Sequence, residues 1–84
     1  MNEFDKKLDT IGQRAAWAID ERCLKNRGSK AQEYGKVDVT YLTMSNWRKG
    51  KTDPRGYHLQ QMALQGYDIF WILTGVRNGR KGQE

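Results

Sequence analysis

The chain has 84 residues, with 15 Lys or Arg against 10 Asp or Glu, so its formal net charge is +5. A chain of this length forms one domain with a modest core. Its spread-out aromatic residues, including three tryptophans, argue against a disordered chain. Because Cys23 is the only cysteine, a disulfide framework and a cysteine-based zinc site are excluded. The sequence shows neither a membrane-spanning run nor a signal-peptide core, which predicts a cytoplasmic protein with no membrane partner.

Apolar residues between positions 4 and 23 recur at three- and four-residue steps, which predicts a first helix with one buried stripe. We expect Asn2 to cap this helix and Gly28 to end it with a positive φ. Ser29 and Gln32 have the spacing of a capping box. A short second helix should therefore start there.

Three further helices are expected in the second half of the chain. The sequence predicts a third helix from Thr40 to Lys49, a fourth from about Tyr57 to Gln65, and a short fifth helix capped by Asp68. Glycines at positions 50, 66 and 75 mark the ends of these helices. The predicted fold is all-α, a compact bundle of about five short helices over residues 1–75. Residues 76–84 have no apolar period and are expected to form a basic flexible tail.

The third helix has two different faces. Its inner face carries Met44 and Trp47, and Val37 and Val39 precede it at spacings that allow all four to share one small core. A helix, a tight turn and a second helix with one polar face is the arrangement that lays a helix in the DNA major groove. These residues therefore predict a helix-turn-helix, and the densest charge excess, six basic against three acidic residues, falls within positions 29–56.

The outer face of the third helix carries side chains suited to base edges. Asn pairs with adenine, Ser and Lys donate to guanine or phosphate, and Leu meets a thymine methyl. The expected base-contacting residues are Thr40, Tyr41, Leu42, Ser45, Asn46 and Lys49. Cations near the helix end, and the amides that begin the second helix, would hold the DNA backbone. The expected phosphate-contacting residues are Ser29, Lys30, Arg48, Lys51 and Arg55.

Two motifs resemble a known family. Residues 45–49 (Ser-Asn-Trp-Arg-Lys), followed by Pro54, and residues 71–75 (Trp-Ile-Leu-Thr-Gly) resemble the DNA-binding heads of bacteriophage repressors, the lambda-repressor-like helix-turn-helix family. The resemblance covers about residues 11–75. It implies a five-helix bundle that binds a pseudo-palindromic operator in double-stranded DNA as a homodimer and represses transcription. The implied location is the cytosol or nucleoid of a bacterial host.

The chain departs from the family pattern in the first half of the motif. Members usually have a small residue in the middle of the motif's first helix and a glycine at the start of the turn. Without a gap, these places fall on Tyr34 and Asp38; with three extra residues in the turn, they fall on Ala31 and Gly35. We prefer the ungapped alignment, because it starts the second helix at the predicted capping box and keeps the valines in apolar positions.

A function of another class is compatible with the same residues. A protein-interaction adaptor of antirepressor or antitoxin type, with weak or no specific DNA binding, would use Tyr34, Tyr41, Leu42 and Phe70 as its surface. Phe70 and Trp71 together exceed what a small core requires, so we expect a self-association patch there, with Phe70 partly exposed.

Catalysis is the class of function that the sequence supports least. It shows no Ser or Cys beside a plausible base, no phosphate-binding glycine loop, and one histidine. We therefore expect neither an enzyme nor a metal site, and neither a cofactor nor a small-molecule substrate.

Overall fold

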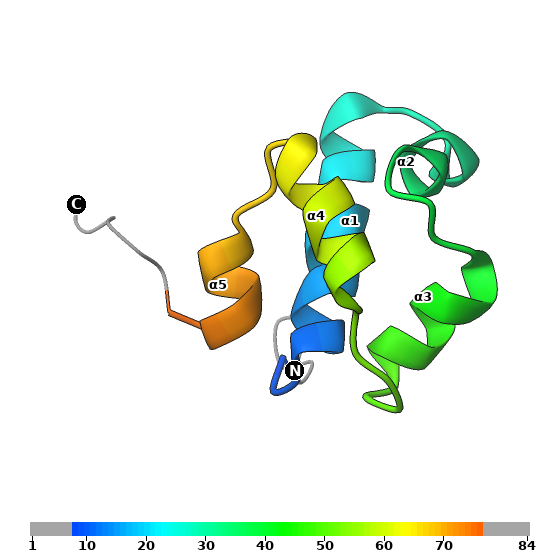
Figure 1. Ribbon diagram of the computed structural model, residues 1–84. Helices are drawn as coiled ribbons and strands as arrows, with labels where there is room; N and C mark the ends of the chain where they lie inside the picture. Colours follow the sequence, from blue (N-terminus) through cyan, green and yellow to red (C-terminus); the bar gives the residue numbers. More distant parts are fainter. Residues whose placement is uncertain (1–7, 77–84) are drawn as a thin grey trace, which may run out of the picture.

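The computed structural model describes residues 8–76, which form five helices around one core (Figure 1). The helices are α1 (Ile11–Asn26), α2 (Lys30–Lys36), α3 (Tyr41–Arg48), α4 (Gly56–Leu64) and α5 (Ile69–Thr74). No strand occurs in residues 8–76, so the predicted all-α class is confirmed. The predicted cap Asn2 and nearly all of the predicted tail lie outside the described residues.

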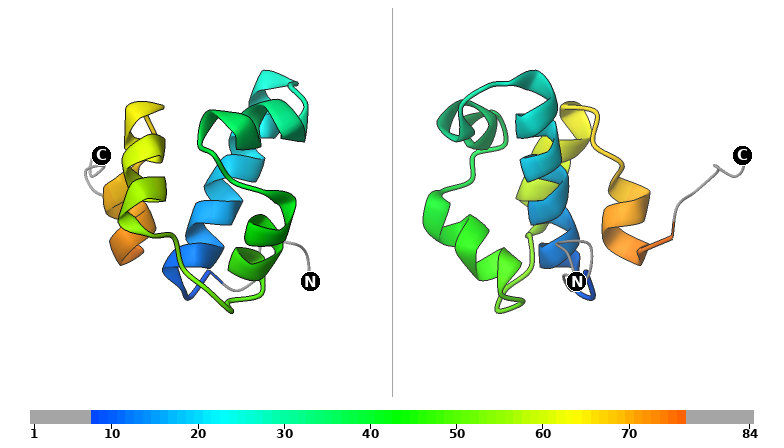
Figure 2. Two further views of the ribbon diagram at one scale, coloured as in Figure 1. Left: turned by 45° about the vertical axis from the view of Figure 1, so that its right-hand side comes forward. Right: turned by 180° about the vertical axis from the view of Figure 1, so that it is seen from behind.

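Helix α1 is the central support of the bundle. It packs against α2, α3 and α5, while α4 packs against α5. Figures 1 and 2 place α3 and α5 on opposite sides of α1. The largest fully buried side chains come from α1, α3, α4, α5 and the α2–α3 turn, and are Trp47, Ile19, Met44, Met62, Ile72 and Val37. A single core therefore supports both α3 and α5 from opposite sides of α1.

The start of α1 differs from the prediction. Thr10 caps the helix, because its hydroxyl accepts the Gln13 N–H at 3.0 Å and Gln13 Oε1 accepts the Thr10 N–H at 3.1 Å. Residues 8–10 are not helical, so the predicted continuous helix across positions 4–23 is wrong in that part. At the other end, Arg27 (φ 55°) takes the left-handed conformation expected of Gly28, since the helix already ends at Asn26.

The remaining helix ends follow the local sequence. Side-chain oxygens of Ser29, Thr40 and Asp68 accept backbone N–H groups in the first turns of α2, α3 and α5. The three glycines expected to end α3, α4 and α5 all have positive φ, namely Gly50 (78°), Gly66 (85°) and Gly75 (80°). Short-range capping therefore sets most of the boundaries.

A buried arginine attaches α5 to α1. Arg14 is only 9% exposed, and its Nε and Nη2 donate to the carbonyls of Ile72 and Leu73 at 2.8 and 3.4 Å. Its Nη1 donates to the Leu8 carbonyl at 2.8 Å. A cation at the C-terminal end of a helix satisfies free carbonyls and interacts favourably with the helix dipole. Arg14 thus stabilises the short helix α5 in its position.

Gly12 lies where α1 meets the loop between α3 and α4. Its N–H donates to Asp53 Oδ1 at 2.9 Å. A Cβ at this position would lie 2.4 Å from the carbonyl oxygen of Thr52 and 3.2 Å from the Cα of Trp47. Both neighbours are backbone atoms, so only glycine allows this approach.

We predict opposite effects for two glycine substitutions. Gly12→Ala should lower the free energy of unfolding by about 2–3 kcal/mol, because the methyl group forces backbone atoms apart. Gly35→Ala is the matched control, since Gly35 lies inside α2 with nothing within 4 Å of a new Cβ. That change should stabilise by about 0.5–1 kcal/mol through helix propensity. Urea unfolding followed by circular dichroism measures both, and equal effects would contradict the close approach.

Tyr67 is a core tyrosine whose hydroxyl is buried. The guanidinium carbon of Arg22 lies 3.7 Å from the centre of its ring. The hydroxyl has no hydrogen-bond partner among the described residues. Burial raises the pKa of Tyr67 to about 12, from an ordinary value of 10.0. The folded state therefore favours the neutral phenol.

The raised pKa predicts a loss of stability at high pH. The contribution is fully present below the unfolded pKa near 10 and is lost as the pH rises through about 12. Tyr67→Phe should change the free energy of unfolding at neutral pH by no more than about 1 kcal/mol, because the hydroxyl has no partner within residues 8–76. The variant should also lose less stability than the wild type across this alkaline range. Urea unfolding at several pH values tests this, with Tyr41→Phe, at an exposed tyrosine, as control.

Candidate nucleic-acid interface

The segment between α2 and α3 is a tight four-residue turn, residues 37–40. Val39 N–H donates to the Tyr34 carbonyl at 3.0 Å, and Asp38 between the two valines has φ 57°. Val37 and Val39 are 0% and 6% exposed. The turn is therefore anchored by its two valines, while the residue between them adopts a conformation that Asp tolerates better than most residues.

Helix α4 also holds this turn. The hydroxyl of Tyr57 donates to Asp38 Oδ2 at 3.0 Å. This hydrogen bond to the carboxylate raises the pKa of Tyr57 above its ordinary value. The Asp38 carboxylate is thus engaged within the domain and not left as an isolated negative charge beside α3.

The inner face of α3 is fully buried. Met44 and Trp47 are 0% and 1% exposed. The Trp47 ring meets His58 of α4 edge to face, with 5.4 Å between ring centres. These two side chains fix the orientation of α3 against the rest of the domain.

The outer face of α3 presents the predicted base-contacting residues. Tyr41 and Leu42 are mostly exposed, Lys49 is exposed, and Ser45 and Asn46 are half-buried. Within residues 8–76 the side chains of Ser45, Asn46 and Lys49 make no hydrogen bond or ion pair. Their donors and acceptors are therefore available to a ligand.

Thr40 differs from the other residues of this set. Its hydroxyl accepts the Thr43 N–H at 3.1 Å and donates to Thr43 Oγ1 at 3.0 Å. The structure begins α3 at Tyr41 and makes Thr40 its N-cap. Thr40 therefore serves the helix end, and its hydroxyl is already engaged.

All five predicted phosphate-contacting residues are exposed, and four of them lie outside α3. Ser29 caps α2 and Lys30 is its first residue, while Lys51 and Arg55 lie in the loop after α3. Ser29 Oγ accepts the Gln32 N–H at 3.0 Å, which leaves its own O–H free to donate. Figure 2 shows α2, α3 and the following loop on the side of α1 away from α5.

Arg48 is committed to other partners. Its Nε and Nη2 donate to the two carboxylate oxygens of Asp20 at 3.1 and 3.0 Å, and Nη2 also donates to the Tyr34 hydroxyl at 2.8 Å. The hydrogen bond to Asp20 raises the pKa of Arg48, and burial raises the pKa of Tyr34. Sequence reasoning missed Asp20, because it lies 28 residues from Arg48 and no local spacing connects them.

The residues proposed for self-association separate in the structure. Trp71 is 7% exposed and packs edge to face on Trp17, with 5.4 Å between ring centres. The expectation that Trp71 belongs to a self-association patch is therefore wrong, because its ring is part of the core. Phe70 is 48% exposed, and Leu73 and Val76 are also exposed. Phe70 lies on α5, across α1 from Tyr41 and Leu42 (Figure 1).

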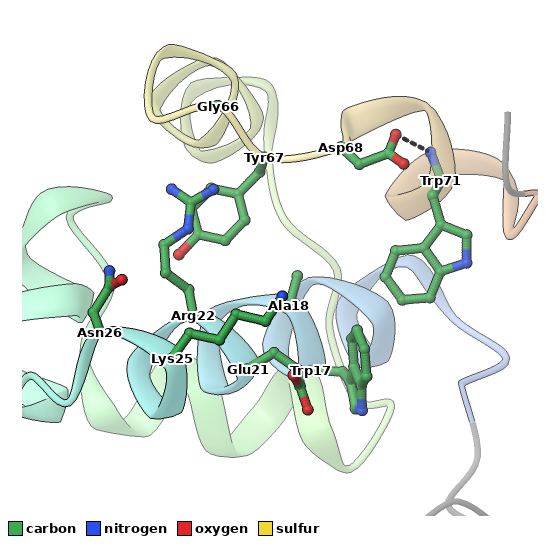
Figure 3. A pocket seen from close by; sticks show the side chains of 10 residues that line it. All are labelled: Trp17, Ala18, Glu21, Arg22, Lys25, Asn26, Gly66, Tyr67, Asp68 and Trp71. Carbon is green, nitrogen blue, oxygen red and sulfur yellow. Dashed lines mark hydrogen bonds between the residues drawn. The ribbon is translucent and has the colours of Figure 1, made fainter. Parts of the chain in front are cut away.

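A cavity of about 320 Å³ lies between α1 and the segment that joins α4 to α5. Figure 3 shows the Arg22 guanidinium over the Tyr67 ring on one side of it, and Trp17 and Trp71 on the other. The remaining lining residues are Ala18, Glu21, Lys25, Asn26, Gly66 and Asp68. None of the predicted DNA-contacting residues lines this cavity.

Comparisons with protein-family models, curated proteins and solved structures gave no match. In residues 8–76 no helix has the length and apolarity needed to cross a membrane. The same residues contain no group of three or more His, Cys, Asp or Glu side chains placed to hold a metal ion.

Proposed function

We propose that this protein is a sequence-specific DNA-binding transcriptional regulator, a phage-type repressor that inserts α3 into the major groove. One observation carries the proposal. The outer face of α3 offers the polar groups of Ser45, Asn46 and Lys49, which have no partner within residues 8–76, while the inner face is locked by Met44 and Trp47. A rigid helix with available donors and acceptors is what direct readout of base edges requires.

The charge around α3 supports the same proposal. Lys30, Lys51 and Arg55 are exposed, and none of them pairs with an acidic group within the described residues. Unpaired cations beside a reading helix can replace the counterions condensed on DNA, which supplies much of the affinity. Lys30 precedes α3 in the chain and Lys51 and Arg55 follow it, which fits contacts to the DNA phosphates on both sides of the major groove.

The turn geometry supports the ungapped alignment with the phage repressor family. Gly35 lies within α2, whereas Asp38 takes the positive φ. A glycine that begins a turn usually supplies such a φ. Asp38 therefore occupies the conformation that the family's glycine would provide, and α3 begins within one residue of its predicted start.

A homodimer on DNA is compatible with the dimensions of the domain. Its extents are 33 × 30 × 27 Å. Reading adjacent major grooves on one face of B-DNA requires the two α3 helices of a dimer to lie about 34 Å apart, and domains of this size can sit side by side at that spacing. Phe70, Leu73 and Val76 are the exposed apolar side chains on and beside α5 that would pack in such a dimer.

The adaptor alternative has one observation in its favour. Tyr41 and Leu42 are 60% and 71% exposed, which is more apolar surface than base contacts require. The other residues of its proposed surface do not extend the exposed patch, because Tyr34 contacts Tyr41 but is buried, and Phe70 lies across α1. DNA binding is therefore the function that the arrangement of side chains favours.

Selection of binding sites from a random duplex pool at physiological salt tests the proposal. A repressor should enrich an inverted repeat whose half-sites are about one helical turn apart. An unenriched pool, combined with strong stabilisation of the protein by a protein partner, would support the adaptor.

The selected site permits a comparison of two variants. Asn46→Ala should cost about 1–3 kcal/mol on the selected site and relax base preference at one position, because a base contact is lost. Lys51→Ala should weaken selected and random duplexes alike and reduce the salt slope by about one. Titrations by fluorescence anisotropy measure both, and equal losses on both duplexes for Asn46→Ala would contradict its role.

Phe70→Ala tests the dimer. The substitution should weaken self-association and lower the apparent affinity for an inverted repeat about tenfold or more, because the second copy no longer binds cooperatively. Leu24→Ala is the matched control, since Leu24 is also exposed but lies on α1. Sedimentation velocity and DNA titration give the two readouts. If Phe70→Ala leaves both unchanged, Phe70 has no part in assembly.

A further inference from the structure

Three side chains from three helices form a closed triangle beside α3. Asp20 of α1 holds the Arg48 guanidinium through two hydrogen bonds, and Arg48 donates to the Tyr34 hydroxyl of α2. The Tyr34 hydroxyl donates in turn to Asp20 Oδ1 at 3.4 Å. We call this set the Asp20–Tyr34–Arg48 clamp. It fastens the C-terminal end of α3 to both α1 and α2.

The clamp also reaches the N-terminal end of α3. The ring of Tyr34 meets the ring of Tyr41 edge to face, with 4.9 Å between ring centres. Tyr41 is the first residue of α3 and Arg48 is its last. Tyr34, which is 2% exposed, therefore contacts both ends of the helix that is proposed to read bases.

The clamp neutralises one cation at the proposed interface. Both carboxylate oxygens of Asp20 are occupied by Arg48, and the side chains of the pair are 34% and 40% exposed. A guanidinium prefers a bidentate oxygen partner, and DNA phosphate offers the same geometry as a carboxylate. Because the pair is accessible to solvent, Asp20 competes with phosphate for Arg48.

We propose that Asp20 is a positioning residue that keeps Arg48 away from the DNA backbone and fixes the angle of α3, and so increases discrimination between operator and random DNA. The inference rests on the proposed DNA-binding function. A fixed α3 favours the one geometry that satisfies its base contacts. Withholding a cation lowers the sequence-independent part of the affinity, which every duplex shares. Both effects reduce binding to random DNA relative to the operator.

The decisive measurement is the dependence of affinity on salt. Asp20→Asn removes the negative charge that retains Arg48, so Arg48 should engage a phosphate. The slope of log affinity against log salt on random duplex should steepen by about 0.9, the value for one additional phosphate contact. Lowering salt fourfold should then raise the affinity of the variant about three- to fourfold more than that of the wild type. The ratio of selected-site to random-duplex affinity should fall.

Two variants separate this effect from its alternatives. Arg48→Gln alone should have the same slope as the wild type. If Arg48 already contacted a phosphate in the wild type, the slope of this variant would be shallower than that of the wild type. Asp20→Asn combined with Arg48→Gln should abolish the increase seen in Asp20→Asn. Asp38→Asn is the matched charge control, because Asp38 is also near α3 but is held by Tyr57 and not by a cation. It should not steepen the slope.

The outcomes separate the inference from the function on which it rests. If wild-type protein fails to bind any duplex, both are overturned. If the wild type binds and Asp20→Asn leaves the slope unchanged, or Asp38→Asn changes it equally, only the role of Asp20 is overturned. Thermal unfolding of each variant shows that the folded protein was measured, and Asp20→Glu supplies a folded carboxylate variant in which the wild-type slope should be retained.

Discussion

The close contact between Gly12 and the end of α3 is the constraint on which the rest of the structure depends. The absence of a side chain at Gly12 lets α1 approach the backbone of Trp47 and Thr52. Trp47 can then be almost completely buried, with His58 of α4 against its ring. Because one large residue contributes much of a small core, the direction in which α3 points is fixed by this contact. A Cβ at position 12 would therefore push the backbone at the end of α3 away from α1.

The side chains on the two sides of α1 differ in chemical character. On one side of α1, charged and hydrogen-bonding groups surround α3, and two carboxylates on that side, Asp20 and Asp38, are engaged by Arg48 and Tyr57. On the other side, Arg14 satisfies carbonyls of α5, whose exposed residues are largely apolar. Exposed cations such as Lys49 and Lys51 thus lie on the α3 side of the central helix, and the exposed apolar residues Phe70 and Leu73 lie on α5. This separation is compatible with one face for DNA and another for a second copy.

Much of the fold was predictable from the sequence because its signals are local. Capping by Ser29 and Asp68 and the positive φ of the helix-ending glycines depend on residues a few positions apart. The periodicity that predicted burial of Met44 and Trp47 is a property of one helix. The start of α1 was missed although its signal, Thr10 followed by Gln13, was present. The longer apolar stripe obscured it.

The sequence by itself determined the five helices, most of their ends, and which residues of α3 face inward. Only the tertiary structure decided which charged groups are available around α3. Arg48 resembles its neighbours Lys49 and Lys51 in sequence, yet it is paired with Asp20, which lies 28 residues away on another helix. Likewise, Trp71 and its neighbour Phe70 differ in burial only because of how α5 sits against α1. Helix ends depend on short-range hydrogen bonds, whereas the pairing and burial of a side chain depend on which distant segment the core brings beside it.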